Sequence, residues 1–314
     1  MKKLISIISM ALTICFFGSS ITSASSLEIG MGWVGESGMA KRVAQGFEQG
    51  IKDLAPDIKI EYQKELDSLE GLSDVVDRWE KEKKAMVILR SNGAKWLANN
   101  PPSIPTFIGG CNHPSQLGVV KNLNSPEGKI TGVTYFLPVA TQFDIFQAIL
   151  PNMKSVLLLL GRGNPSAVVD QSGTKEICSK LGIEYYEAFC SSAEEAIKAV
   201  NQYKGKISTV IIGNQAVIMD KADKIVAAAG KTPVLSYSSK PVKIGALGGF
   251  VADDVKLGYM LAQSLVDVVV KGKAIKNVPV KVDPEPKFFV NSKTAQRLGI
   301  EMPFSILEAA NVIK

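Results

Sequence analysis

Short runs of β-favouring residues alternate with amphipathic helical segments along almost the whole chain, and this alternation restricts the fold more than any other feature. Short strands separated by helices are typical of βαβ units, which build a parallel sheet covered on both faces. The alternation runs up to about residue 138 and then begins again. The strand segments are "LEIGMGWV", "IKIEYQKE", "MVILRSN", "IPTFIGGC" and "KITGVTYFLP", then "SVLLLLGRGN", "IEYYEAFCS", "STVIIGNQ" and "TPVLSYSS". The sequence therefore predicts an α/β protein with two doubly wound parallel-sheet lobes.

The boundary between the two series lies near Pro138, in the segment "TGVTYFLPVATQ". This segment has no Gly, Ser or Pro tract of the kind that lets domains move independently. We therefore expect several close connections between the lobes, which together form a hinge. Ligands of open α/β sheets bind beyond the carboxyl ends of the strands. A cleft between two such sheets collects these ends from both lobes, so we expect a ligand there.

The N-terminal segment, residues 1–26, is interpreted as a cleaved signal peptide. Lys2 and Lys3 precede the apolar run "LISIISMALTICFFG", and "SSITSASS" then supplies the small residues that suit signal peptidase. The apolar run is short and interrupted by Ser and Thr, whereas a membrane span needs about 20 apolar residues. We therefore expect the mature protein to be periplasmic or otherwise extracytoplasmic.

Composition and charge exclude several classes of function. The chain has 314 residues, of which 46% are hydrophobic, enough to fill two cores. The net charge of +6 is spread without a long basic block, which argues against a nucleic-acid partner. A single histidine, His113, and the lack of C-x-x-C spacing argue against a metal site. Cys111, Cys178 and Cys190 allow one disulfide and require none.

The glycine-rich stretch "GALGGFVADD", residues 245–254, resembles a phosphate-binding turn only superficially. It lacks the G-x-G-x-x-G spacing, and Asp253 and Asp254 would repel a phosphate. We expect the glycines to let the backbone bend beside the cleft as the chain returns to the first lobe. Asp253 or Asp254 is then suited to cap the helix that follows. The sequence thus indicates neither a nucleotide nor another cofactor.

Polar and aromatic residues follow several predicted strands, at the ends that should face the cleft. Hydroxyls and backbone N–H groups at helix starts suit a carboxylate, although helix capping is the alternative role for each residue. The polar candidates of this kind are Ser37, Ser91, Asn92 and Asn164. Aromatic side chains can stack on a flat ligand or pack in the core. The aromatic candidates are Trp33, Tyr135 and Tyr237.

Four segments in the second half of the chain are similar to a known family. They are "KITGVTYFLP", "ILPNMKSVLLLL", "TPVLSYSSKPVKIGALGGFVADDVKLGYMLAQSLVDVVVKGK" and "FFVNSKTAQRLGIEMPFSILEAANVIK". In this order they resemble the substrate-binding proteins of ABC transporters whose known members take up tryptophan, tyrosine and related compounds. The resemblance extends from about residue 101 to the end and is weaker over residues 27–100.

This resemblance implies a type I periplasmic-binding-protein fold, with two lobes joined by three crossovers and a small-molecule ligand between them. It implies no catalysis, ABC permease subunits in the membrane as partners, and a monomer. The crossovers are expected near Pro138, at residues 245–249 and at residues 273–283. The first lobe would then contain residues 27–138 and about 246–276, and the second residues 139–245 and about 277–314.

Members of this family that bind amino acids commonly have acidic residues in loops where this chain is neutral. The corresponding positions hold Asn112, His113, Tyr135, Asn214, Gln215 and Ser238. A buried ammonium needs a carboxylate or several acceptors, because an unpaired buried charge costs several kcal/mol. The acids expected near the cleft are Glu36 and Asp253. We therefore expect a small, flat, aromatic or largely apolar ligand with at most one anionic group and no tightly held ammonium.

Three alternatives remain open on the sequence. The chain resembles members that bind tryptophan or tyrosine, so an amino acid is one alternative. A sensor would use the same two-lobed fold and differ only in the partner on its outer face. An enzyme on the same fold class is disfavoured, because no paired acid–base motif, no G-x-S-x-G elbow and no second histidine is present.

Overall fold

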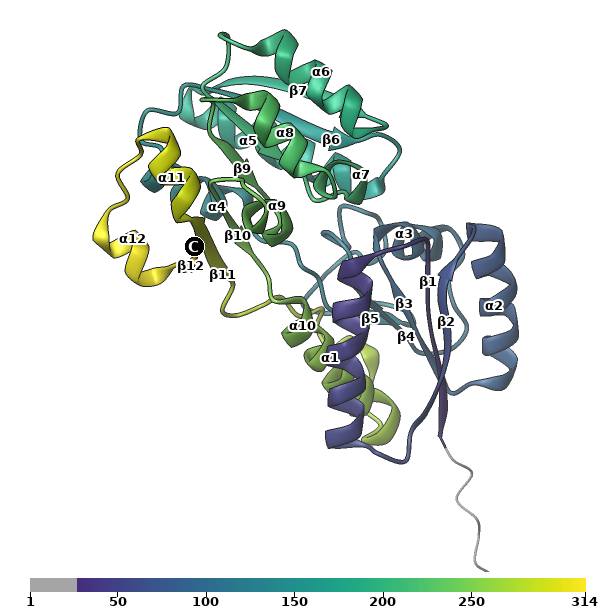
Figure 1. Ribbon diagram of the computed structural model, residues 1–314. Coiled ribbons are helices and arrows are strands. Elements are labelled where there is room, and N and C mark those ends of the chain that lie inside the picture. The colour runs from purple at the N-terminus through teal and green to yellow at the C-terminus, as the bar shows by residue number, and fades with distance from the viewer. Residues whose placement is uncertain (1–26) are drawn as a thin grey trace, which may run out of the picture.

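The computed structural model describes residues 27–314, so the signal-peptide interpretation of residues 1–26 lies outside the described part of the chain. Figure 1 shows two α/β lobes, one above the other, with the connecting segments at the waist between them. Each lobe has one sheet with helices on both faces, as the alternating sequence pattern predicts.

The first lobe is built on a parallel sheet with the strand order β2-β1-β3-β4-β5. Its strands are β1 (Glu28–Val34), β2 (Lys59–Leu66), β3 (Ala85–Leu89), β4 (Thr106–Gly109) and β5 (Ile130–Gly132). Its helices are α1 (Gly38–Leu54), α2 (Leu69–Glu82), α3 (Ser91–Asn99) and α10 (Asp254–Leu265), with the short π-helix η1 (Val266–Val270) and the 3₁₀ helix η2 (Ile275–Asn277). Helices α1 and α10 cover one face and α2 and α3 the other, which buries the central strand β3 completely.

The second lobe is built on a sheet with the order β12-β11-β10-β9-β8-β6-β7, in which only β10 and β11 pair antiparallel. Its strands are β6 (Ser155–Gly161), β7 (Glu184–Cys190), β8 (Thr209–Ile212), β9 (Val234–Ser236), β10 (Gly248–Val251), β11 (Lys287–Asn291) and β12 (Asn311–Ile313). Its helices are α4 (Val139–Ile149), α5 (Pro165–Leu181), α6 (Ala193–Tyr203), α7 (Ala216–Met219), α8 (Ala222–Ala229), α9 (Ser239–Lys243), α11 (Ser292–Leu298) and α12 (Phe304–Ala309). Helices α4, α5 and α11 pack on one face, and α6, α7 and α8 on the other.

Helix α10 returns to the first lobe and packs closely against α1 because glycines lie at the contact. A Cβ on Gly46 would lie 1.9 Å from the Val255 carbonyl oxygen, and a Cβ on Gly258 would lie 2.1 Å from the Val43 carbonyl oxygen. Any larger residue at these positions would push the two helices apart. Two segments distant in the sequence are thereby joined in one hydrophobic core.

The second crossover lies later in the chain than the sequence suggested. The glycines of residues 245–249 were expected to form it, but Gly248 and Gly249 belong to strand β10, which pairs with β9 and β11 of the second lobe. A Cβ on Gly249 would lie 2.7 Å from the Ser236 carbonyl oxygen, so glycine permits close approach to the neighbouring backbone. The chain crosses at Ala252 and Asp253, between β10 and α10.

The third crossover begins at the end of the expected range of residues 273–283. Lys281 forms an isolated parallel bridge with Val133, and its N–H donates to the Gly132 carbonyl oxygen at 2.9 Å. Val280 packs in the hydrophobic core beneath α2 and α3. Residues 278–281 therefore contact the first lobe, and the chain crosses between Lys281 and β11.

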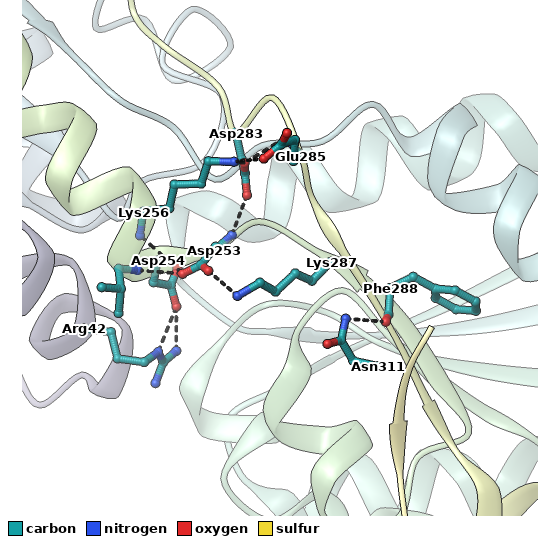
Figure 2. A network of polar contacts seen from close by, with 10 residues as sticks. Arg42, Asp253, Asp254, Lys256, Asp283, Glu285, Lys287, Phe288 and Asn311 are labelled. Atoms are coloured by element: carbon teal, nitrogen blue, oxygen red, sulfur yellow. Dashed lines mark hydrogen bonds and ion pairs between the residues drawn. The ribbon is translucent and has the colours of Figure 1, made fainter. Parts of the chain in front are cut away.

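A polar network joins the second and third crossovers (Figure 2). Asp253 is the N-cap of α10, as expected, and its carboxylate accepts from the Val255 N–H at 3.1 Å and also pairs with Lys287. The Asp283 carboxylate accepts from the backbone N–H groups of Asp253, at 2.8 Å, and Glu285, at 3.0 Å. The network fixes the start of α10 against the segment that leads into β11.

Among residues 27–314, no helix combines the length and apolar character needed to cross a membrane. The cysteines in this part of the chain, Cys111, Cys178 and Cys190, are buried free thiols. The one disulfide that the sequence allowed is therefore not formed.

Candidate functional site

A cavity of about 740 Å³ lies between the lobes and is lined from both sides. Its walls are the segments that follow β1, β3 and β4 in the first lobe and β6, β8 and β9 in the second. The carboxyl ends of the strands thus face a shared cleft, as expected for two open α/β sheets. The predicted site residues that line it are Glu36, Ser37, Ser91, Asn92, Asn112, Tyr135, Asn164, Asn214, Tyr237 and Ser238.

Some of these polar side chains also cap helices. Ser37 accepts from the Ala40 N–H at 3.2 Å at the start of α1. Asn164 accepts from the Ser166 N–H at 3.0 Å at the start of α5. By contrast, Ser238 holds the N-cap position of α9 without a side-chain hydrogen bond to that helix. The capping alternative therefore applies to Ser37 and Asn164, whose side chains are already engaged at the edge of the cavity.

Two predicted residues lie behind the cavity wall. Trp33 is 1% exposed and packs in the core beneath α1 and α10, because β1 is a central strand that is buried on both faces. Gln215 is 1% exposed, and its amide nitrogen donates to Asp170 at 2.7 Å while its amide oxygen accepts from the Gly161 N–H at 3.0 Å. Gln215 therefore does not line the cavity, but its hydrogen bonds hold Asp170 and the end of β6 in place.

His113 and Asp253 are the other predicted residues that do not line the cavity. The His113 ring packs edge-on against the Phe136 ring, with the ring centroids 4.6 Å apart. Burial lowers the pKa of this histidine. Asp253 is held in the hinge network by the N-terminus of α10 and by Lys287. Its neighbour Asp254 is the acid at this point of the wall, and it forms an ion pair with Arg42 at 2.7 Å.

Asp170 is a cavity residue that sequence reasoning missed. It lies on α5 and is 7% exposed. Its carboxylate accepts from the Asn112 amide at 2.9 Å, the Gln215 amide at 2.7 Å and the Asn214 backbone N–H at 3.1 Å. Burial raises the pKa of Asp170 to about 6, although these hydrogen bonds act in the opposite direction. Glu36 lines the cavity as expected, but Asp253 does not, and Asp170 is a buried acid of the cleft that the sequence analysis did not name.

The sequence did contain a signal for Asp170. Ser166, Asp170 and Thr174 are spaced four residues apart in α5, so they lie on one face of the helix, and all three are buried. A polar stripe of this kind on a buried helix face indicates a polar site rather than a core. The strand-end rule overlooked it because the residues belong to a helix.

The two cleft tyrosines have different surroundings. Tyr237 is 7% exposed, its hydroxyl forms a 2.7 Å hydrogen bond with the Thr174 hydroxyl, and its ring stacks on Phe146. Tyr135 is half-buried on the first crossover and lines the cavity, and burial raises its pKa. Tyr237 is thus partly a core residue, whereas Tyr135 lies at the cavity on the segment that connects the lobes.

The chain matches the family described as ABC transporter substrate binding protein over residues 33–314. This chain belongs to that family. A curated relative, the tyrosine-binding protein of Clostridioides difficile (strain R20291), is 22% identical over 281 residues, which cover 87% of this chain and 81% of the relative.

Two solved structures resemble this substrate-binding protein. One is an ABC domain from Streptococcus pneumonia in complex with L-Trp, with a TM-score of 0.81, 22% identity, and coverage of 92% of this chain and 100% of that one. The other is a ligand-free, open substrate-binding protein with adhesive properties from Clostridium difficile, with a TM-score of 0.75, 21% identity, and coverage of 92% and 99%. The substrate-binding protein has the type I periplasmic-binding-protein fold that the sequence predicts.

The cleft of this substrate-binding protein contains several cations, and most are neutralised within the protein. The pairs are Lys41 with Glu65 at 2.8 Å, Arg42 with Asp254 at 2.7 Å, Lys240 with Asp220 at 2.7 Å and Arg162 with Glu195 at 3.7 Å. Arg90, which directly follows β3, has no such partner among residues 27–314. In the same part of the chain, no three His, Cys, Asp or Glu side chains are grouped as metal ligands would be.

Proposed function

We propose that this substrate-binding protein captures an aromatic amino acid outside the cytoplasm and presents it to the permease of an ABC uptake system. The observation that carries the proposal is the buried carboxylate of Asp170, which lines the cleft with no Lys, Arg or His within 4.0 Å among residues 27–314. A ligand ammonium would neutralise this charge, and an uncompensated buried charge is costly.

Neighbouring groups support the same proposal. The side-chain oxygen of Asn214 is buried in the cleft wall and has no hydrogen-bond partner among residues 27–314, and the Asn214 backbone N–H donates to Asp170 at 3.1 Å. This oxygen is a second acceptor for an ammonium beside the carboxylate. The rings of Tyr135 and Phe136 also line the cavity, which suits a flat side chain. The proposed location is supported by the signal-peptide pattern of residues 1–26.

A deaminated aromatic acid is the second candidate. Three neutral donors already surround Asp170, so its charge is partly compensated without a ligand. This candidate agrees with the expectation, drawn from the neutral loops, of a ligand with one anionic group and no ammonium.

Calorimetry separates the candidates. L-tryptophan, L-tyrosine and L-phenylalanine are titrated beside indole-3-propionate, 3-(4-hydroxyphenyl)propionate and 3-phenylpropionate. We expect an amino acid to bind more tightly than its deaminated partner and to release protons at pH 6, because an ammonium lowers the raised pKa of Asp170. Asp170→Asn should remove both effects. Preference for the deaminated acids would select the second candidate, and binding of none of the six compounds would reject an aromatic ligand.

A further inference from the structure

Arg90 brings a positive charge into the cleft that no carboxylate of the described chain balances. The residue is half-buried and lines the cavity at the point where β3 ends and α3 begins. No Asp or Glu oxygen of residues 27–314 lies within 4.0 Å of its guanidinium, whereas the other cationic side chains of the cavity wall have such partners. The role of Arg90 is therefore not that of an internal ion pair.

The backbone of Arg90 also sets the residue apart. Its φ angle is 76° and its ψ angle is 155°, a backbone conformation that is essentially confined to glycine. It holds the N-cap position of α3, where Ser, Thr, Asn or Asp would supply a capping oxygen, and it makes no side-chain hydrogen bond to the helix. Local structure gives no reason for an arginine here, and strained residues of this kind cluster at functional sites.

The guanidinium is held in a fixed place. Its Nη1 group donates to the Val34 carbonyl oxygen at the end of β1, and the Arg90 N–H donates to the Gly109 carbonyl oxygen at 2.9 Å. A Cβ on Gly35 would lie 2.9 Å from Nη1, so glycine at this turn leaves room for the side chain. A guanidinium has five N–H donors arranged in a planar fork. Within residues 27–314 the Val34 oxygen is the acceptor of this guanidinium, so further N–H donors remain for a ligand.

The surroundings favour an anion at the same point. The first residues of α1 and α3, Gly38 and Ser91, line the cavity, and the N-termini of helices carry partial positive charge. Arg90 is half-buried, so its charge is held partly away from water, and this burial lowers the pKa of the guanidinium. Of the acids that line the cavity, Glu36 is exposed to solvent, Asp254 and Asp220 are paired with Arg42 and Lys240, and Asp170 lies on α5 of the opposite lobe.

We propose that Arg90 is the carboxylate receptor of the cleft and that the ligand carries a carboxylate held by this guanidinium. The inference rests on the proposed function for the place of the ligand, but it does not depend on which candidate is correct, because an amino acid and its deaminated analogue both carry the carboxylate. Arginine suits this role because its planar fork binds both oxygens of a carboxylate at once.

The test compares acids with their neutral amides, using calorimetry and thermal shift. The probe pairs are L-tryptophan with L-tryptophanamide, 3-phenylpropionate with 3-phenylpropionamide, and L-leucine with L-leucinamide. We expect the acids that bind to do so about 10- to 100-fold more tightly than their amides, the range for a hydrogen bond to a charged group. Arg90→Gln should lower acid affinity by a similar factor and abolish the preference for acid over amide.

Two variants serve as controls. Arg90→Lys keeps the charge but loses the planar fork, so we expect an intermediate loss. Lys180→Gln removes an exposed cation of α5 that is paired with Glu176 and lies outside the cavity wall, so it should leave acid binding within about threefold of wild type. Urea denaturation establishes that each variant is folded. If Arg90→Gln fails to fold, the acid–amide comparison on the wild-type protein decides the question alone.

The outcomes separate this inference from the proposed function. Equal binding of acid and amide by the wild-type protein, unchanged acid binding by Arg90→Gln, or failure of every acid to bind would each overturn the role of Arg90. Acid-selective binding confined to the leucine pair would support Arg90 as carboxylate receptor and reject an aromatic ligand.

Discussion

Each face of the interlobe cleft holds one buried or half-buried charge without an ion-pair partner among residues 27–314, positive on the first lobe and negative on the second. The first lobe presents Arg90, half-buried at a strained N-cap position and anchored to one backbone oxygen. The second lobe presents Asp170, which is 7% exposed and surrounded by three neutral donors. The first charge does not titrate near neutral pH, whereas the second does. A change of pH near 6 therefore alters the charge of Asp170 and leaves the charge of Arg90 unchanged.

The largest expected effect distinguishes the two cleft tyrosines. Tyr237→Ala removes a ring buried in the core of the second lobe and stacked on Phe146, so we expect the free energy of unfolding to fall by about 3 to 5 kcal/mol. Tyr135→Ala removes a half-buried ring on the crossover and should cost about 1 kcal/mol of stability. Urea denaturation measures both. Equal losses would mean that the two faces are packed alike.

The pH dependence of stability tests the titrating face. Burial raises the pKa of Asp170 from 3.8 to about 6 in the folded protein, so the folded state binds the proton more tightly than the unfolded state. This contribution is fully present below about pH 4 and is lost as the pH rises through 6, which amounts to about 3 kcal/mol. The stability of wild type relative to Asp170→Asn should therefore fall by up to this amount between pH 4 and pH 7. A flat difference would show that Asp170 is not desolvated.

A smaller effect is expected at the hinge that joins the two faces. Asp283→Ala removes the acceptor of the Asp253 and Glu285 N–H groups, and we expect a loss of about 2 kcal/mol in unfolding free energy. The matched control is Glu285→Gln, because Glu285 belongs to the same network but its side chain is 84% exposed. That variant should cost less than about 0.5 kcal/mol. A similar loss in both variants would mean that the exposed Glu285 side chain contributes as much stability as the buried Asp283 carboxylate.

The subtlest expected change is a movement of the faces toward one another. Saturation with a ligand identified by calorimetry should lower the radius of gyration measured by small-angle scattering, because a ligand that contacts both lobes favours the closed form. The hydrogen bond from the Asn112 amide to Asp170 already joins the lobes at 2.9 Å. An unchanged radius would indicate that this contact holds the faces together before the ligand arrives.

Much of the fold could be predicted from the sequence, because each strand and helix is marked by its own residues. The run "AMVIL" of β3 and the cap at Asp253 are read within a few neighbouring positions. The strand ends then placed Ser91, Asn112 and Asn214 in the cleft. The same rule misplaced Trp33, because the side chains of a central strand alternate between two buried faces, and only the packing of α1 and α10 decides which face Trp33 occupies.

The sequence by itself determined the two α/β series, the strand ends that meet at the cleft and the caps of its helices, because these depend on contacts within a turn or a strand. Only the tertiary structure decided where the chain crosses between the lobes. Gly248 and Gly249 form a strand, and not a bend, because β9 and β11 lie beside them and supply hydrogen-bond partners. The same holds for the charges of the site. Asp170 meets Asn112, which lies 58 positions away, and Arg90 has no counter-ion among residues 27–314, whereas the cavity acids Asp254 and Asp220 pair with Arg42 and Lys240. Such long-range pairings follow from how two lobes face each other, and no local pattern records them.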